Sequence, residues 1–91
     1  MPVRRLPPLR ALEAFMRTVR SGSARAAADE LGLSPSALSR RIANLEDFVG
    51  KKLFTRARQS MQLTDEGQHF YEAVGPHFDA LARASLDDLR R

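Results

Sequence analysis

SARAAADELGLSPSALSR, residues 23–40, contains two helix start signals and one stop signal. Ser23 is a good N-cap because its hydroxyl can accept a backbone N–H of the next turn that would otherwise lack a partner. Gly32 stands where a helix commonly ends in a left-handed residue. Ser34 and Pro35 repeat the start signal, since proline at the first helical position gives up no needed N–H. The stretch therefore predicts two short helices joined by a tight turn at Gly32-Leu33.

The second of these helices has two chemically different faces. Its apolar positions recur at i, i+4, i+7 and i+11 and fall in one narrow sector: Leu38, Ile42, Leu45 and Val49. The opposite sector holds Ser36, Ser39, Arg40, Ala43 and Asp47. Short hydroxyl side chains and one arginine at the start of a helix suit entry into the major groove of DNA, where N-terminal positions reach base edges. The pair of helices is therefore interpreted as a helix-turn-helix.

Further elements are expected on both sides of this motif. A first helix follows Pro7-Pro8, with its apolar positions at Leu9, Leu12, Phe15, Met16 and Val19. After Gly50, the alternating runs 52–55 and 60–63 predict a two-stranded hairpin around a polar tip at 56–59. Thr64 then caps a last helix that is expected to run to the C-terminus, with Asp65 and Glu66 at the positive end of its dipole. Gly75-Pro76 predicts a kink or a brief break in it.

Length and composition restrict the class of protein. The chain has 91 residues, which fits one domain, and no cysteine, so a disulfide framework and a thiolate metal site are excluded. Charged residues interrupt the N-terminal apolar run, so we expect an intracellular protein. The interpretation as a DNA-binding motif adds the expectation of a cytoplasmic protein associated with the nucleoid. His69 and His77 have no third ligand nearby, and no catalytic constellation stands out. Neither a metal, nor another cofactor, nor an enzymatic activity is expected.

Charge is distributed unevenly along the chain. Residues 1–25 carry six basic and one acidic side chain, and residues 34–63 carry six basic and two acidic ones. Residues 26–33 hold two acidic groups, and residues 64–91 hold six acidic and three basic groups. A basic N-terminal two-thirds is typical of a surface that binds a polyanion, although charge alone equally fits an ordinary solvated surface.

Many of these residues together resemble the LysR-type transcriptional regulators. The resemblance rests on residues 23–40, Ile42, Leu45, Glu46, Gly50, Leu53-Phe54, Arg56 and the segment LTDEG at 63–67. The opening LPPLRALEAF, residues 6–15, is similar to the branch that includes the glycine-cleavage activator. The resemblance implies a mainly α fold, namely a winged helix-turn-helix with a three-helix core and a two-stranded hairpin wing. It also implies a domain division at residues 1–63 and 64–91, the latter a long linker helix for dimerisation, with the family's effector-binding domain absent from this chain.

The resemblance also implies which residues meet double-stranded DNA. Base and phosphate contacts are expected from Pro35, Ser36, Ser39 and Arg40, and backbone contacts from Arg56 in the wing. Arg41 lies nearer the edge of the core sector, so DNA contact and simple solvation remain equally open for it. Gln59 stands where many members have a basic residue, and Arg58 beside it is expected to substitute. Lys51 and Lys52 fit either phosphate contact or a solvated hairpin.

An apolar stripe on the last helix predicts a homodimer. Its members are Phe70, Val74, Phe78 and Leu81, with Leu89 further on. Such a helix would extend past a three-helix core, and part of its apolar stripe would be exposed to solvent unless a second copy covers it. A two-fold dimer would read an interrupted inverted repeat with one recognition helix, residues 35–48, in each half-site. Two alternatives stay open: the stripe packs only on its own domain, or the fold serves as a protein-interaction module without DNA.

Overall fold

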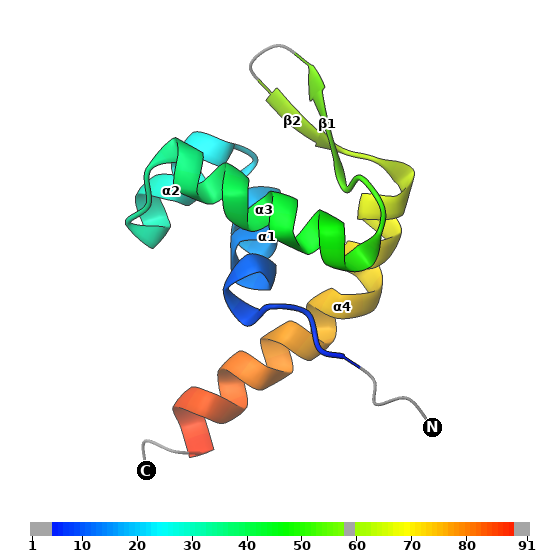
Figure 1. Ribbon diagram of the computed structural model, residues 1–91. Helices are drawn as coiled ribbons and strands as arrows, with labels where there is room; N and C mark the ends of the chain where they lie inside the picture. The colour runs from blue at the N-terminus through cyan, green and yellow to red at the C-terminus, as the bar shows by residue number, and fades with distance from the viewer. Residues whose placement is uncertain (1–4, 58–59, 89–91) are drawn as a thin grey trace.

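The computed structural model describes residues 5–57 and 60–88, with residues 56, 57, 60, 87 and 88 described by their backbone alone. Three helices, α1 (Leu9–Ser21), α2 (Ala24–Leu31) and α3 (Pro35–Val49), pack together and are followed by a hairpin of β1 (Phe54–Ala57) and β2 (Ser60–Leu63). Helix α4 (Asp65–Arg83) starts at the base of the hairpin and runs past α1 away from the core, ending in one π-helical turn, η1 (Ala84–Asp88) (Figure 1). The fold is the predicted winged helix-turn-helix with a long last helix.

The helix start and stop signals act as the sequence predicts. Ser23 accepts a hydrogen bond from the Ala26 N–H at 3.1 Å, Ser34 from the Ala37 N–H at 3.1 Å, and Thr64 from the Gly67 N–H at 2.9 Å. Gly32, in the turn between α2 and α3, has a φ of +68°, a backbone angle that residues with a Cβ rarely adopt. These local contacts set the start of three helices and the turn of the motif.

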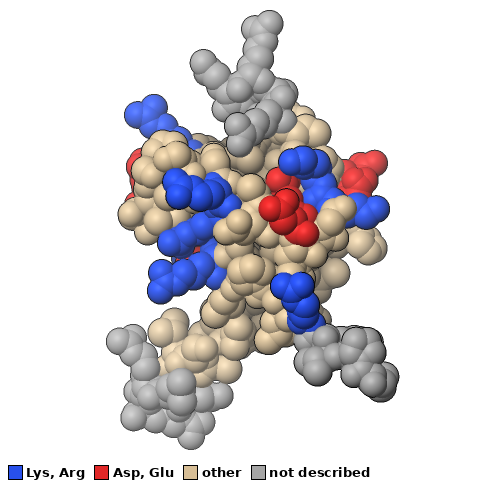
Figure 2. Space-filling model, viewed as in Figure 1, with Lys and Arg blue, Asp and Glu red and all other residues tan. Residues whose placement is uncertain are grey.

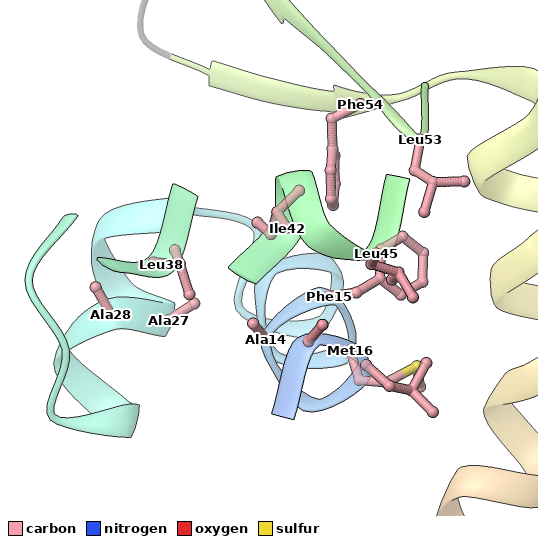
Figure 3. Close-up of a cluster of buried hydrophobic side chains, with 12 residues drawn as sticks. Ala14, Phe15, Met16, Ala27, Ala28, Leu38, Ile42, Leu45, Leu53 and Phe54 are labelled. Carbon is pink, nitrogen blue, oxygen red and sulfur yellow. The ribbon is translucent and has the colours of Figure 1, made fainter. Parts of the chain in front are cut away.

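Phe15 of α1 is the centre of the core. Its ring is fully buried, and its centroid lies 5.5 Å from that of Phe54 in the hairpin and 5.3 Å from that of Phe70 in α4. On the other side of the core, Leu38 of α3 faces Ala27 and Ala28 of α2 (Figure 3). Both alanines are buried, and their small side chains allow the two helices to approach closely. The core therefore fixes α3 against α1, α2 and the base of the hairpin at once.

The first strand of the hairpin begins two residues later than the predicted run 52–55, whereas the second strand occupies the predicted residues 60–63. The paired residues run from Phe54 opposite Leu63 to Ala57 opposite Ser60, which shortens the tip to residues 58–59, outside the described part. Leu53 lies opposite Thr64 in the same register: its carbonyl accepts the Thr64 N–H at 3.0 Å, and its side chain is fully buried. The N–H groups of Leu53 and Phe54 donate to the Glu46 carboxylate and not to the second strand. A Cβ at Gly67 would overlap the Leu53 carbonyl oxygen. Leu53 thus forms the joint between hairpin and α4.

Helix α4 is continuous through Pro76, so of the predicted kink or brief break at this point, the break does not occur. Proline costs the helix the hydrogen bond to the Glu72 carbonyl. The helix is held on both sides of that gap: Gly75 is buried against the Met16 side chain of α1, and Asp79, one turn further on, pairs with Arg20. Within residues 5–57 and 60–88, no helix combines the length and apolar character that crossing a membrane requires.

Candidate nucleic-acid interface

Helix α3 separates its apolar and polar side chains as its sequence predicts. Leu38 and Leu45 are fully buried, and Ile42 retains only 3% of its accessible surface. On the opposite side, Ser36 and Arg40 are exposed, and Ser39 is half-buried toward the hairpin. The buried side anchors the helix in the core, so the exposed side is rigidly presented to solvent.

The first turn of α3 offers a small set of hydrogen-bond donors. Pro35 has no N–H, and the Ala37 N–H is taken by the Ser34 hydroxyl. Among the described residues, the Ser36 N–H is then the first-turn donor with no protein partner. The Ser36 hydroxyl lies 3.3 Å from that of Ser34. The partial positive charge of a helix start adds to these donors, and together they suit a phosphate or a base edge.

Charge along α3 is polarised. Arg40 has no carboxylate within 4.0 Å among the side chains that the structure describes. Basic side chains gather where α2 and the N-terminal half of α3 lie, whereas nearer the C-terminal half of α3 an acidic group lies among basic ones (Figure 2). Glu46 and Asp47 are the acidic residues of that half. The N-terminal half of α3 is therefore the part best suited to a polyanion.

Glu46 connects α3 to the hairpin. One carboxylate oxygen accepts the Leu53 N–H at 2.8 Å and the Phe54 N–H at 3.3 Å, and the other lies 3.8 Å from the Lys52 ammonium group. The Glu46 side chain retains 11% of its accessible surface. Sequence reasoning included Glu46 only as part of a family pattern and assigned it no contact. In the structure it sets where the hairpin starts relative to α3.

A groove of about 410 Å³ separates α3 from the wing. Its walls are Ser39, Ile42, Ala43 and Glu46 from α3, and Lys52, Phe54 and Met61 from the hairpin and its approach. The half-buried Ser39 thus faces the wing side of α3, and Arg40 lies on the open side. The arrangement presents a helix, a groove and a wing side by side, which is the shape of a helix that enters one DNA groove beside a wing on the backbone.

The model of the bacterial regulatory helix-turn-helix protein, lysR family, matches residues 9–68. The chain belongs to the LysR family. The "Glycine cleavage system transcriptional activator" of Escherichia coli (strain K12) is 43% identical over 82 residues, which cover 90% of this chain. The match spans 27% of that activator, so this LysR-family chain has about a quarter of the length of the curated relatives it matches.

Solved structures of this family agree with the fold. The BenM DNA-binding domain in complex with catB site 1 DNA has a TM-score of 0.80 and 31% identity, over 91% of this chain and 93% of that one. The full-length virulence activator AphB of Vibrio cholerae has a TM-score of 0.83 and 28% identity, over 88% of this chain and 28% of that one. This LysR-family chain is therefore a DNA-binding domain of a transcriptional regulator, a class of protein that is not enzymatic.

The structure places five of the predicted DNA-binding residues of this LysR domain on α3, and the side chains of the other two lie outside the described part. Pro35, Ser36, Ser39 and Arg40 lie in the first two turns of α3, and Arg41 is half-buried on its flank. Arg56 is in β1, but its side chain is outside the described part, as is the whole of Arg58. Among the described residues, no three His, Asp or Glu side chains lie close enough together to hold a metal ion.

The predicted dimerisation stripe divides into two parts. Phe70, Val74 and Phe78 are half-buried and pack against the core of their own domain. Leu81 retains 51% of its accessible surface and lines an open cleft with Leu9, which is 58% exposed. The exposed part of the stripe is therefore at the end of α4, near the start of α1.

A clamp between α1 and α4 was not expected from the sequence. The Arg20 guanidinium donates to both carboxylate oxygens of Asp79 at 2.7 and 2.8 Å and to the Tyr71 hydroxyl at 3.2 Å. The hydrogen bonds that Arg20 donates lower the pKa of Asp79 below its ordinary value. The same contacts with Asp79 and Tyr71 raise the pKa of Arg20. The clamp fixes the direction in which α4 leaves the domain.

Proposed function

We propose that this domain binds double-stranded DNA sequence-specifically by inserting its recognition helix, residues 35–48, into the major groove. The observation that supports this most directly is the position of Ser36 and Arg40, exposed on the side of α3 opposite the buried Leu38, Ile42 and Leu45. The chain's likeness to a family member solved on DNA supports the same conclusion. The protein would work where its DNA is, in the bacterial cytoplasm on the nucleoid.

Each contact residue has a role that its chemistry suits. Arg40 presents a bidentate fork to guanine O6 and N7 or to a phosphate, and Ser36 and Ser39 donate to bases or phosphates. Pro35 packs against the DNA at the helix start, and Arg41 reaches a phosphate from the flank of α3. Arg56 and Arg58 supply the wing contacts to the DNA backbone. Base reading is thus confined to the first two turns of α3.

The test begins with duplexes selected by this chain from a random pool, titrated at several salt concentrations. If a dimer neutralises about eight phosphates, the slope of log K against log[salt] is near −7. Arg40→Ala costs roughly 1 to 3 kcal/mol on the selected site and relaxes its base preference. The matched control is Arg17→Ala, because Arg17 is exposed on α1 and already paired with Glu30 at 3.4 Å. No salt-sensitive binding to any duplex would disprove the function, and unchanged binding by Arg40→Ala would remove Arg40 from base reading.

We also propose that the domain acts as a homodimer through its C-terminal helix and reads an interrupted inverted repeat. Leu81 and Leu86 on the last helical segment are 51% and 55% exposed, and Leu9 at the start of α1 is 58% exposed. Leaving several leucines in a small region exposed to water is unfavourable in free energy, which supports a surface there that a second copy covers. A two-fold axis through this region would give the two recognition helices opposite directions along the DNA.

A further inference from the structure

Arg5 lies just before α1 and next to the C-terminal half of the recognition helix. Its guanidinium carbon is 5.8 Å from the centroid of the Phe48 ring, the geometry of a cation–π contact. Arg5 is exposed, and Phe48 is half-buried in α3. Among the described side chains, Arg5 has no carboxylate within 4.0 Å. The guanidinium is therefore held over an aromatic face without being neutralised by an ion pair.

The surroundings of Arg5 form a cleft that continues the DNA-facing side of α3. The cleft has a volume of about 360 Å³ and is lined by Arg5, Pro8, Asn44, Asp47 and Phe48. Asn44 is exposed and lies one helical turn beyond Arg40, so the two side chains are neighbours on the same side of α3. The donors of Ser36, Arg40, Asn44 and Arg5 thus follow one another from the start of the helix to the N-terminal segment.

We propose that Arg5 is a further DNA-contacting residue, which binds a backbone phosphate at the edge of the groove occupied by α3. A guanidinium stacked on a ring keeps its in-plane N–H groups free, and their fork geometry matches two phosphate oxygens. Because Phe48 already orients the side chain, binding costs less conformational entropy than ordering a free arginine. A phosphate is the expected partner because Arg5 lies beside α3, whereas the outward face of α3 itself is expected to meet the bases.

This inference rests on the proposed DNA binding, and its test separates the two. The wild-type chain and the variants Arg5→Ala, Arg5→Lys and Phe48→Leu are titrated with the selected duplex and with a mixed-sequence duplex at several salt concentrations. For Arg5→Ala, the slope of log K against log[salt] is expected to become shallower by about 0.9 per protomer. The affinity at about 50 mM salt is expected to fall about tenfold per protomer, and both effects should be the same on the two duplexes. Arg5→Lys should keep the salt slope of the wild type but bind DNA more weakly. The affinity of Phe48→Leu should lie between those of the wild type and Arg5→Ala.

Arg17→Ala is the matched control, since it removes the same charge from an exposed arginine that is paired with Glu30. In phosphate ethylation interference on the selected duplex, Arg5→Ala should show one fewer phosphate per half-site at which ethylation weakens binding. Arg17→Ala should show the same phosphates as the wild type. Wild-type slope and affinity in Arg5→Ala, an equal loss in Arg17→Ala, or an altered base preference in Arg5→Ala would each overturn the role of Arg5 while leaving DNA binding intact. A wild-type chain that binds no duplex would overturn both.

Discussion

At the scale of single residues, Glu46 holds together the two parts of the surface that we expect to meet DNA. Its carboxylate is the acceptor for two backbone N–H groups, those of Leu53 and Phe54, at the point where the chain turns from α3 into the wing. Both of these residues have buried side chains, so water is poorly placed to replace the carboxylate. A side chain outside the DNA contact set thus determines where the wing lies.

Replacing Glu46 with alanine should therefore destabilise the domain. Two N–H donors lose their partner, which costs about 1 to 3 kcal/mol of unfolding free energy each when a buried donor stays unsatisfied. Glu46→Gln keeps one oxygen acceptor and should cost clearly less. Urea unfolding measures both variants, and salt-dependent DNA titration reports whether wing contacts are lost. A Glu46→Ala variant as stable as the wild type would show that the carboxylate does not support the wing.

The residue contacts that the sequence predicted are those made within one or two turns. Ser23, Ser34 and Thr64 cap the helices that follow them, because an N-cap and its partner are three residues apart. The Arg20 contact with Asp79 spans 59 residues and depends on how α1 and α4 pack. No local pattern encodes such a contact, which is why it was missed.

At the scale of elements, the buried face of α3 determines the stability on which DNA recognition depends. Leu38→Ala or Ile42→Ala is expected to cost roughly 2 to 5 kcal/mol of unfolding free energy, because each removes core volume beneath the recognition helix. Denaturant unfolding followed by circular dichroism gives the value. The control is Ala43→Ser on the exposed face, which should stay within about 0.5 kcal/mol of the wild type. Neutral results at Leu38 and Ile42 would mean that another face of α3 is buried.

Helix α4 depends on a titratable contact. The pKa of Asp79 is lowered in the folded state by its hydrogen bonds to Arg20, so the carboxylate contributes stability above its ordinary pKa of about 3.9 and loses it as the pH falls through the lowered value. Asp79→Asn should therefore lower the Tm at neutral pH, and its difference from the wild type should shrink below about pH 4.

Thermal melting between pH 2.5 and 7 tests this prediction. Asp29→Asn is a suitable control, because Asp29 is an exposed carboxylate of α2 with no ion pair among the described side chains. Its Tm difference from the wild type should change little with pH. Since the clamp is partly exposed, salt should also weaken it. A Tm difference for Asp79→Asn that stays constant down to pH 2.5 would show that the clamp does not stabilise the fold.

The number and order of elements followed from sequence, whereas two of their details did not. Alternation alone allowed the first strand to begin at Lys52, but the N–H groups of Leu53 and Phe54 donate to the Glu46 carboxylate and not to the second strand, and the strand begins at Phe54. Proline at position 76 predicted a kink or a break because the prediction considered α4 in isolation. Packing of Gly75 on α1 and the Arg20–Asp79 clamp hold the helix on both sides of the proline. Tertiary contacts decided both details.

At the scale of the whole molecule, the proposed DNA contacts of α3 and the wing lie apart from the exposed leucines at the start of α1 and on the last helical segment: Leu9, Leu81 and Leu86. The segment before α1 carries both kinds of residue, since Arg5 is followed by the exposed Leu6. Helix α4 connects the two regions, running from the base of the wing to the far end of the domain (Figure 1). Pairing of two domains through the leucines would thus leave both recognition helices accessible to DNA.

The dimer can be tested by placing a charge at its expected centre. Leu81→Glu keeps a good helix former in α4 but puts a carboxylate where a second copy should cover apolar surface, and burying an unpaired charge is unfavourable. Sedimentation velocity should show dimers for the wild type and monomers for Leu81→Glu, whereas Ala80→Glu, on a neighbouring exposed position of α4, should remain dimeric. Because two linked half-sites bind more tightly than one, Leu81→Glu should also lose the preference for an inverted repeat over a single half-site. A wild type that stays monomeric at high concentration, or a Leu81→Glu variant that dimerises normally, would mean that α4 does not join two domains through this face.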